Sequence, residues 1–149
     1  MASLALCAAL GGAGCEDKGS GWEPSERQFR DFQLVYPVLL RDCGFPDCHG
    51  AKDRFYRVWG PGRVRLDPDT HAFDGVTGGE ASASFTLALS MIDARHPEQS
   101  LLLRKPLAVA AGGAGHGGVD RYGRDVYRTV DDAGYAALSR FVLGVAEKK

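Results

Sequence analysis

Residues 25–50 read SERQFRDFQLVYPVLLRDCGFPDCHG, and this stretch decides the fold of the chain. Ser25 is a favourable N-cap. Apolar residues recur after it at helical spacing, at Phe29, Phe32, Val35, Tyr36 and Leu39. The pattern predicts a helix from Ser25 to about Asp42, in which Pro37 should kink or restart the helix.

Two cysteines and a histidine follow this helix directly, as Cys43-Gly-Phe-Pro-Asp-Cys48-His49. Two thiols followed at once by an imidazole are typical of covalent c-type haem attachment, in which the sulfurs bind the vinyl groups and the imidazole binds the iron. The common motif has two residues between the cysteines, whereas this one has four. The loop must therefore fold back, and Gly44 and Pro46 would permit such a bend.

Three other interpretations of the motif stay open. Cys43 and Cys48 could form a disulfide, which a four-residue gap permits in an exported protein. The two cysteines, His49 and a distant histidine could instead bind zinc, although a second cysteine pair is absent from the sequence. His49 could also be a polar loop residue.

Apolar spacing predicts two more helices. The first runs from about Glu80 to Ala94, and its apolar residues are Phe85, Ala88, Leu89 and Ile92. The last is capped by Asp131 or Asp132, and one face of it holds Tyr135, Leu138, Phe141, Val142 and Val145. Residues 54–66 could form short strands, residues 97–106 a short helical turn, and residues 107–125 a glycine-rich loop. Three principal helices with long loops and little sheet predict a mainly α fold.

The motif and the later elements together resemble bacterial c-type cytochrome domains, most closely the divergent cytochrome-c-like domains of planctomycetes and myxobacteria. The matching segments are Val35–Leu39 leading into Cys43, Cys48, His49 and Gly50, then His96–Leu102, Lys105-Pro106, His116-Gly117-Gly118 and Tyr135–Gly144. The similarity covers residues 29–50 and 92–145. It implies a small helical domain over residues 25–147, with Cys43 and Cys48 as thioether positions and His49 as the proximal iron ligand.

Two residues compete for the sixth position of such an iron. Met91 has the side chain that most class I cytochromes use, but it lies in a predicted helix, where a buried methionine is usually packing. His116 lies between glycines, in a loop that can bring an imidazole over the iron. We therefore expect His49 and His116 as the metal ligands, with Met91 as the alternative. His71 is expected at the surface, and His96 in a structural role at a helix end.

Two further groups of residues could belong to the site. Aromatic residues that could wall an apolar pocket, or belong to the ordinary core, are Phe45, Phe55, Tyr56 and Trp59. Basic residues that could pair with haem propionates, or form a solvated face, are Arg54, Arg57, Arg63 and Arg65.

The first fifteen residues, MASLALCAALGGAGC, resemble the end of a secretory signal followed by a bacterial lipoprotein cleavage site. They predict a leader over residues 1–14, an acylated Cys15 and a tether over residues 15–24. No Lys or Arg precedes the apolar run, as in a truncated leader. The alternative is a buried apolar helix. We expect an exported chain on the periplasmic side of a bacterial membrane, attached through a lipid anchor only.

Composition narrows the function. The 149 residues carry a net charge of −1, which gives no basis for nucleic-acid binding, and they hold no apolar run long enough to span a bilayer. No catalytic triad, phosphate loop or metalloprotease helix is visible, so no enzyme activity is expected. The sequence predicts an exported electron-transfer protein with one covalent haem c and a redox partner protein. The alternative is a lipoprotein binding or structural module with a Cys43–Cys48 disulfide and no haem.

Overall fold

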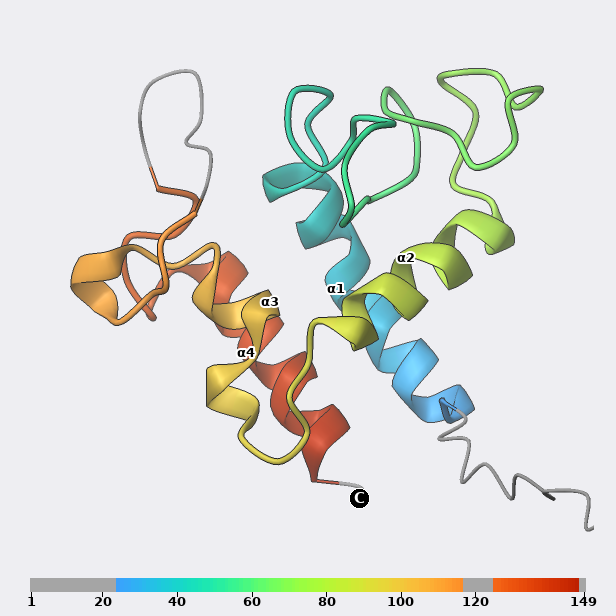
Figure 1. Ribbon diagram of the computed structural model, residues 1–149. Helices are drawn as coiled ribbons and strands as arrows, with labels where there is room; N and C mark the ends of the chain where they lie inside the picture. Colours follow the sequence, from blue (N-terminus) through green and yellow to red (C-terminus); the bar gives the residue numbers. More distant parts are fainter. Residues whose placement is uncertain (1–23, 117–124, 148–149) are drawn as a thin grey trace, which may run out of the picture.

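The computed structural model describes residues 24–116 and 125–147, and these form a mainly helical fold (Figure 1). The helices are α1 (Glu26–Asp42), α2 (Gly78–Ser90), η1 (Pro97–Gln99), α3 (Leu101–Arg104), η2 (Val109–Ala111) and α4 (Ala133–Ala146). Within these residues there is no strand, and one isolated bridge pairs Leu107 with Tyr127. The predicted mainly α fold class is confirmed.

Helix α1 begins as expected, because Ser25 and Gln28 form a capping box. The sequence predicts a kink or restart at Pro37, but α1 continues through this residue, so the restart is wrong. Pro37 lies on the exposed side of the helix, as does Gln33, whose carbonyl loses its partner. Water can reach that carbonyl, which explains why the proline is tolerated.

The core is built around α1, which packs against α2 and α4 (Figure 1). The ring of Phe32 is fully buried, and its centroid lies 5.2 Å from that of Phe85 in α2 and 5.6 Å from that of Phe141 in α4. Leu138 and Val142 are also fully buried, as the predicted apolar face of the last helix requires. Asp132 is the N-cap of that helix, one of the two expected caps.

Helix α2 begins at Gly78, after a capping box between Thr77 and Glu80, and ends at Ser90 rather than at Ala94. At its end the amides of Met91 and Ile92 donate to the carbonyls three residues back, those of Ala88 and Leu89, both at 3.1 Å. The Asp93 carboxylate then turns the chain by accepting hydrogen bonds from the amides of Arg95 and His96, at 2.8 and 3.1 Å. Met91 is therefore the C-cap of α2, so its expected place inside the helix is wrong.

The strands predicted over residues 54–66 are also absent, since this segment consists of turns and bends. Its amides bond singly to the loop after α1: Val58 donates to the carbonyl of His49 at 2.8 Å, and Val64 to that of Gly50 at 2.9 Å. Two separate bonds of this kind do not make the repeated pairing of a β-sheet. They hold the segment against the cysteine-containing loop instead.

The described part of the chain contains no helix that is both long and apolar enough to cross a membrane. Residues 1–23 lie outside the described residues. The predicted leader (residues 1–14), Cys15 and nearly all of the predicted tether (residues 15–24) belong to this segment.

Candidate functional site

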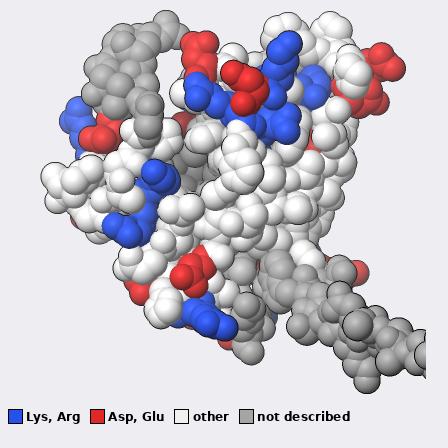
Figure 2. All heavy atoms as spheres, viewed as in Figure 1, with Lys and Arg blue, Asp and Glu red and all other residues white. Residues whose placement is uncertain are grey.

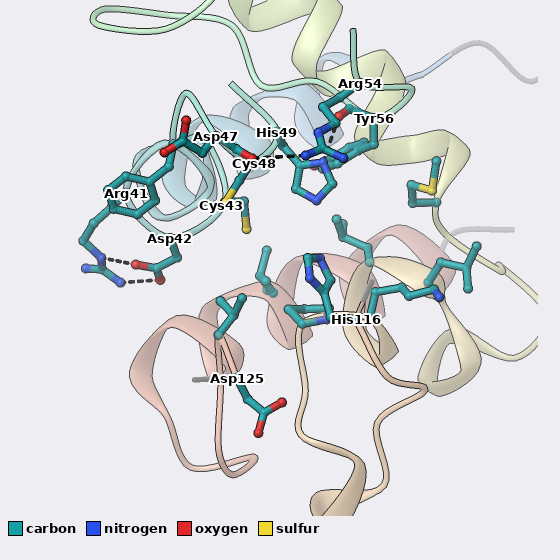
Figure 3. A pocket seen from close by; sticks show the side chains of 18 of the residues that line it. Arg41, Asp42, Cys43, Asp47, Cys48, His49, Arg54, Tyr56, His116 and Asp125 are labelled. Atoms are coloured by element: carbon teal, nitrogen blue, oxygen red, sulfur yellow. Dashed lines mark hydrogen bonds and ion pairs between the residues drawn. The ribbon is translucent and has the colours of Figure 1, made fainter. Parts of the chain in front are cut away.

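A cavity of about 1040 Å³ lies between the loop after α1 and the segments around α3 and α4 (Figure 3). Small-molecule and cofactor sites commonly have volumes of roughly 300–1,000 Å³, so this one is large. All five residues predicted for thioether attachment or iron ligation line it, namely Cys43, Cys48, His49, Met91 and His116. The structure thus brings together residues that are up to 73 positions apart (116 − 43).

The loop between the cysteines folds back on itself, as its four-residue gap requires. The carbonyl of Phe45 accepts hydrogen bonds from the amides of Cys48 and Gly50, at 2.8 and 2.9 Å, and the amide of His49 donates to the carbonyl of Cys43 at 3.1 Å. A Cβ atom at Gly50 would lie 2.3 Å from the carbonyl oxygen of Gly44. The fold of this loop therefore requires a residue without a Cβ atom at position 50.

Both cysteines are free thiols, with Cys43 buried and Cys48 half-buried. Figure 3 shows the two sulfurs on the same wall of the cavity. Burial raises the pKa of the Cys43 thiol to about 12, with smaller contributions from the charges of Asp42 and Cys48. Cys43 is thus protonated at neutral pH in this environment.

The His49 ring is held by the backbone. Its Nδ1 lies 2.9 Å from the carbonyl oxygen of Tyr56. Since a carbonyl only accepts, Nδ1 carries the proton and Nε2 has a lone pair, which is the tautomer that a metal-binding imidazole needs. Burial lowers the pKa of His49, and the charges of His116 and Arg54 lower it further against the opposing effect of the Tyr56 hydrogen bond. The environment thus favours the neutral imidazole.

His116 lies across the cavity from His49. The two ring centroids are 5.7 Å apart and the ring planes are at 77°. In Figure 3 the rings point toward one another from opposite walls. The segment before His116 is anchored by the amide of Ala114 on the carbonyl of Arg104, at 2.9 Å, and by Lys105 Nζ on the carbonyl of Gly115, at 3.3 Å. Gly117 and Gly118, which belong to the predicted element, lie outside the described residues.

His49 and His116 could be the two protein ligands of a haem iron. Across residues 24–116 and 125–147, no three His, Cys, Asp or Glu side chains form a group that could hold a metal ion. A porphyrin supplies four of the iron ligands itself, so two facing imidazoles suffice. Two rings that share one metal have centroids about 6 Å apart, from two metal–nitrogen bonds of about 2 Å and the ring radii. The separation of His49 and His116 is close to this value.

The walls of the cavity are largely apolar. Phe45 and Phe55 are 54% and 81% exposed, although both are large apolar side chains that line it. Tyr56 lines the same wall, and Leu101, Leu102 and Leu138 complete the opposite side. Trp59, the fourth predicted wall residue, is buried away from the cavity. An apolar group in the cavity would cover the two exposed phenylalanines.

Met91 also lines the cavity and remains the alternative iron ligand. Its amide donates to the carbonyl of Ala88 and its carbonyl accepts from the amide of Leu102, both at 3.1 Å. Its side chain is partly buried against the core. The backbone of Met91 is thus fixed by its neighbours, and its side chain has a packing role whether or not it binds a metal.

Of the four predicted arginines, Arg54 lines the cavity. Arg57 lies over the ring of Trp59, Arg63 donates to the carbonyl of Leu40 at the end of α1, and Arg65 pairs with Glu80. The other charged lining residues are Arg41, Asp42, Asp47, Lys105, Asp125, Arg128 and Asp132. Together with Arg54 they give four positive and four negative charges, and Figure 2 likewise shows both signs mixed over the loops at the upper edge of the molecule.

The two remaining histidines lie away from the cavity. His71 is exposed, as the sequence predicts, and His96 is exposed with its Nδ1 3.5 Å from a carboxylate oxygen of Asp93. Asp125, Val126 and Arg128 also line the cavity, and the sequence did not predict their contribution. No local pattern marks them, because this segment is held at the cavity by the hydrogen bond from Tyr127 to Asp42 at the distant end of α1.

In comparisons with known proteins, no family model, no curated protein and no solved structure matches this chain. The function is therefore inferred from the residues of the cavity.

Proposed function

We propose that the chain is an electron-transfer protein that carries one covalently attached c-type haem in this cavity. The observation that supports this most strongly is the pair of facing imidazoles, His49 and His116, with ring centroids 5.7 Å apart across an apolar cavity. Two free thiols on its wall, Cys43 and Cys48, are in the loop that precedes His49 and would be the thioether positions.

Each residue has a role in this proposal. The carbonyl of Tyr56 orients His49 and keeps its Nε2 available, and His116 would bind from the opposite side. Phe45 and Phe55 would exclude water from the ring, and Arg54 would offset part of the negative charge of the haem carboxylates. When bound, the haem supplies reversible one-electron chemistry, whose potential depends on the axial ligands and on burial.

The test is to produce the chain with a cytochrome maturation system and to record its mass and its pyridine haemochrome spectrum. We expect the mass of one haem in addition to the apoprotein, with both thiols consumed. Cys43→Ala and Cys48→Ala should each leave one thioether and shift the haemochrome band, and the double variant should carry no covalent haem. His96→Ala is the control, because His96 is exposed and lies away from the cavity, and it should leave the covalent haem and the haemochrome band unchanged.

The alternative is a lipoprotein binding or structural module with a Cys43–Cys48 disulfide. It predicts a different result in the same experiment. The mass would then be that of the apoprotein minus two hydrogens, and the haemochrome spectrum would be blank. This result would contradict the haem proposal.

We further propose export and attachment to a membrane through a lipid on Cys15, so that the haem would serve a redox partner protein on the periplasmic side. The small residues Gly12-Ala13-Gly14 before Cys15 support this. Cys15→Ser should move the protein from the membrane fraction to the soluble fraction. Unchanged partitioning with an intact N-terminus would contradict the anchor.

A further inference from the structure

Tyr127 connects the two walls of the cavity. Its side chain is 4% exposed, and its hydroxyl donates a hydrogen bond to Asp42 Oδ2 at 2.8 Å, across 85 residues of sequence. Asp42 is the last residue of α1 and directly precedes Cys43. The side chain of Tyr127 is therefore bonded to the wall that carries Cys43, Cys48 and His49.

The backbone of Tyr127 is bonded to the other wall. Its amide donates to the carbonyl of Pro106 at 2.9 Å, and its carbonyl accepts from the amide of Ala108 at 2.8 Å. The carbonyl of Ala108 in turn accepts from the amide of Gly113 at 3.0 Å. This segment leads directly to His116, so Tyr127 is linked through hydrogen bonds to the position of that residue.

The contact between Tyr127 and Asp42 is closely packed. A Cβ atom at Gly134, the second residue of α4, would lie 2.6 Å from Asp42 Oδ2 and 2.6 Å from Tyr127 Cε1. Arg41 donates to both oxygens of the Asp42 carboxylate, at 2.6 and 2.8 Å. Burial raises the pKa of Tyr127, and its hydrogen bond to Asp42 and the negative charge of that carboxylate raise it further. The tyrosine thus remains a protonated donor beside a charged acceptor.

We propose that Tyr127 is a positioning residue for the sixth iron ligand: its hydrogen bond to Asp42 sets the separation of the walls and so how firmly His116 holds its place. The reason is that two imidazoles can share one metal only within a narrow range of separation. A hydrogen bond to a charged acceptor is among the stronger contacts a side chain can make. This inference rests on the proposed haem.

The test uses the full chain with haem attached and measures the affinity of the ferrous protein for carbon monoxide. Carbon monoxide binds only where His116 has left the iron, so its affinity reports how firmly His116 is held. Tyr127→Phe should raise this affinity about tenfold, since losing a hydrogen bond to a charged group has an effect of this order. Tyr135→Phe is the control, since Tyr135 contacts the Tyr127 ring but does not line the cavity. It should leave the affinity unchanged.

Two comparisons separate positioning from a general loss of stability. In a His116→Ala background, Tyr127→Phe should have no further effect on carbon monoxide affinity, because the ligand that it positions is gone. Asp42→Asn keeps an oxygen acceptor and should stay within about threefold of the wild type, whereas Asp42→Ala should resemble Tyr127→Phe.

If Tyr127→Phe carries haem but has the carbon monoxide affinity of Tyr135→Phe, or has the same effect with and without His116, the inference is overturned. If Tyr127→Phe does not load haem, the comparison of Asp42→Ala with Asp42→Asn decides, and equal affinities overturn the inference. Failure of the wild type to attach haem would instead contradict the proposed function.

Discussion

Arg65 and Glu80 form an ion pair with two hydrogen bonds, from Nε to Oε1 at 2.7 Å and from Nη2 to Oε2 at 3.0 Å, and their side chains are only 6% and 1% exposed. Arg65 also donates to the carbonyls of His71, Asp74 and Gly75. The pair therefore fastens the long loop between residues 66 and 76 to the first turn of α2.

Removing one partner of this pair should strongly destabilise the folded protein. Glu80→Ala leaves the Arg65 charge buried without its carboxylate, and we expect the free energy of unfolding to fall by about 3–5 kcal/mol. Urea unfolding measures this directly. Glu26→Ala is the control, because Glu26 is 97% exposed and its oxygen lies 3.7 Å from Arg30. That change should cost no more than about 0.5 kcal/mol. Equal losses in the two variants would show that the buried pair stabilises the fold no more than the exposed pair does.

The lowered pKa of the Glu80 carboxylate predicts how the free energy of unfolding depends on pH. Burial alone would raise the pKa of Glu80, but hydrogen bonds from Arg65 and from the amides of Thr77 and Leu66 outweigh it, so the pKa lies below its ordinary value. Because the folded state binds this proton less readily, the contribution is present above the unfolded pKa of about 4.3 and is lost as the pH falls through the folded pKa. Unfolding in urea from pH 7 to pH 3 should show this loss in the wild type and a shallower one in Glu80→Gln. Parallel profiles would be the contrary result.

The third prediction concerns Gly50, which follows the two cysteines and His49 in the same loop. In Gly50→Ala the new Cβ would meet the backbone oxygens of Gly44 and Phe45, at 2.3 and 2.8 Å, so the loop must open. We expect a loss of about 1–3 kcal/mol of stability and a severalfold lower yield of covalent haem. Gly144→Ala is the matched control in α4, where no atom lies within 4 Å. It should stabilise the helix by about 0.5–1 kcal/mol. Full haem occupancy in Gly50→Ala would show that the loop shape is not required.

The elements that follow local rules could be predicted from the sequence. Helices α1 and α4 have clear apolar periodicity, α1 also has a capping box, and both begin and end close to their expected bounds. The end of α2 was missed because the amides of Met91 and Ile92 bond three residues back while the apolar pattern continues to Ile92. Asp93 then turns the chain directly after that pattern. The strands over residues 54–66 were predicted from short apolar runs, but the amides of Val58 and Val64 bond to the cysteine loop instead.

In the candidate site too, some residues could be predicted from the local sequence and others could not. Cys43, Cys48 and His49 are adjacent in sequence, so their grouping could be predicted, and His116 could be predicted from its glycine neighbours together with the cytochrome resemblance. The bond from Tyr127 to Asp42 joins residues 85 positions apart. No spacing rule marks either residue, because this contact exists only once α1 and the segment before α4 have packed together.

The last prediction concerns the sixth iron ligand, where His116 and Met91 both line the cavity. His116 faces His49 with ring centroids 5.7 Å apart, whereas Met91 is at the end of α2 with its backbone bonded to Ala88 and Leu102. With the haem attached, His116→Ala should give a high-spin or water-ligated ferric iron. Met91→Ala should keep the low-spin spectrum of the wild type, which should have no sulfur-to-iron charge-transfer band, because two imidazoles remain as axial ligands. Absorption and electron paramagnetic resonance spectra measure both. The reverse pair of results would assign the ligand to Met91, and with it the higher potential that a thioether gives.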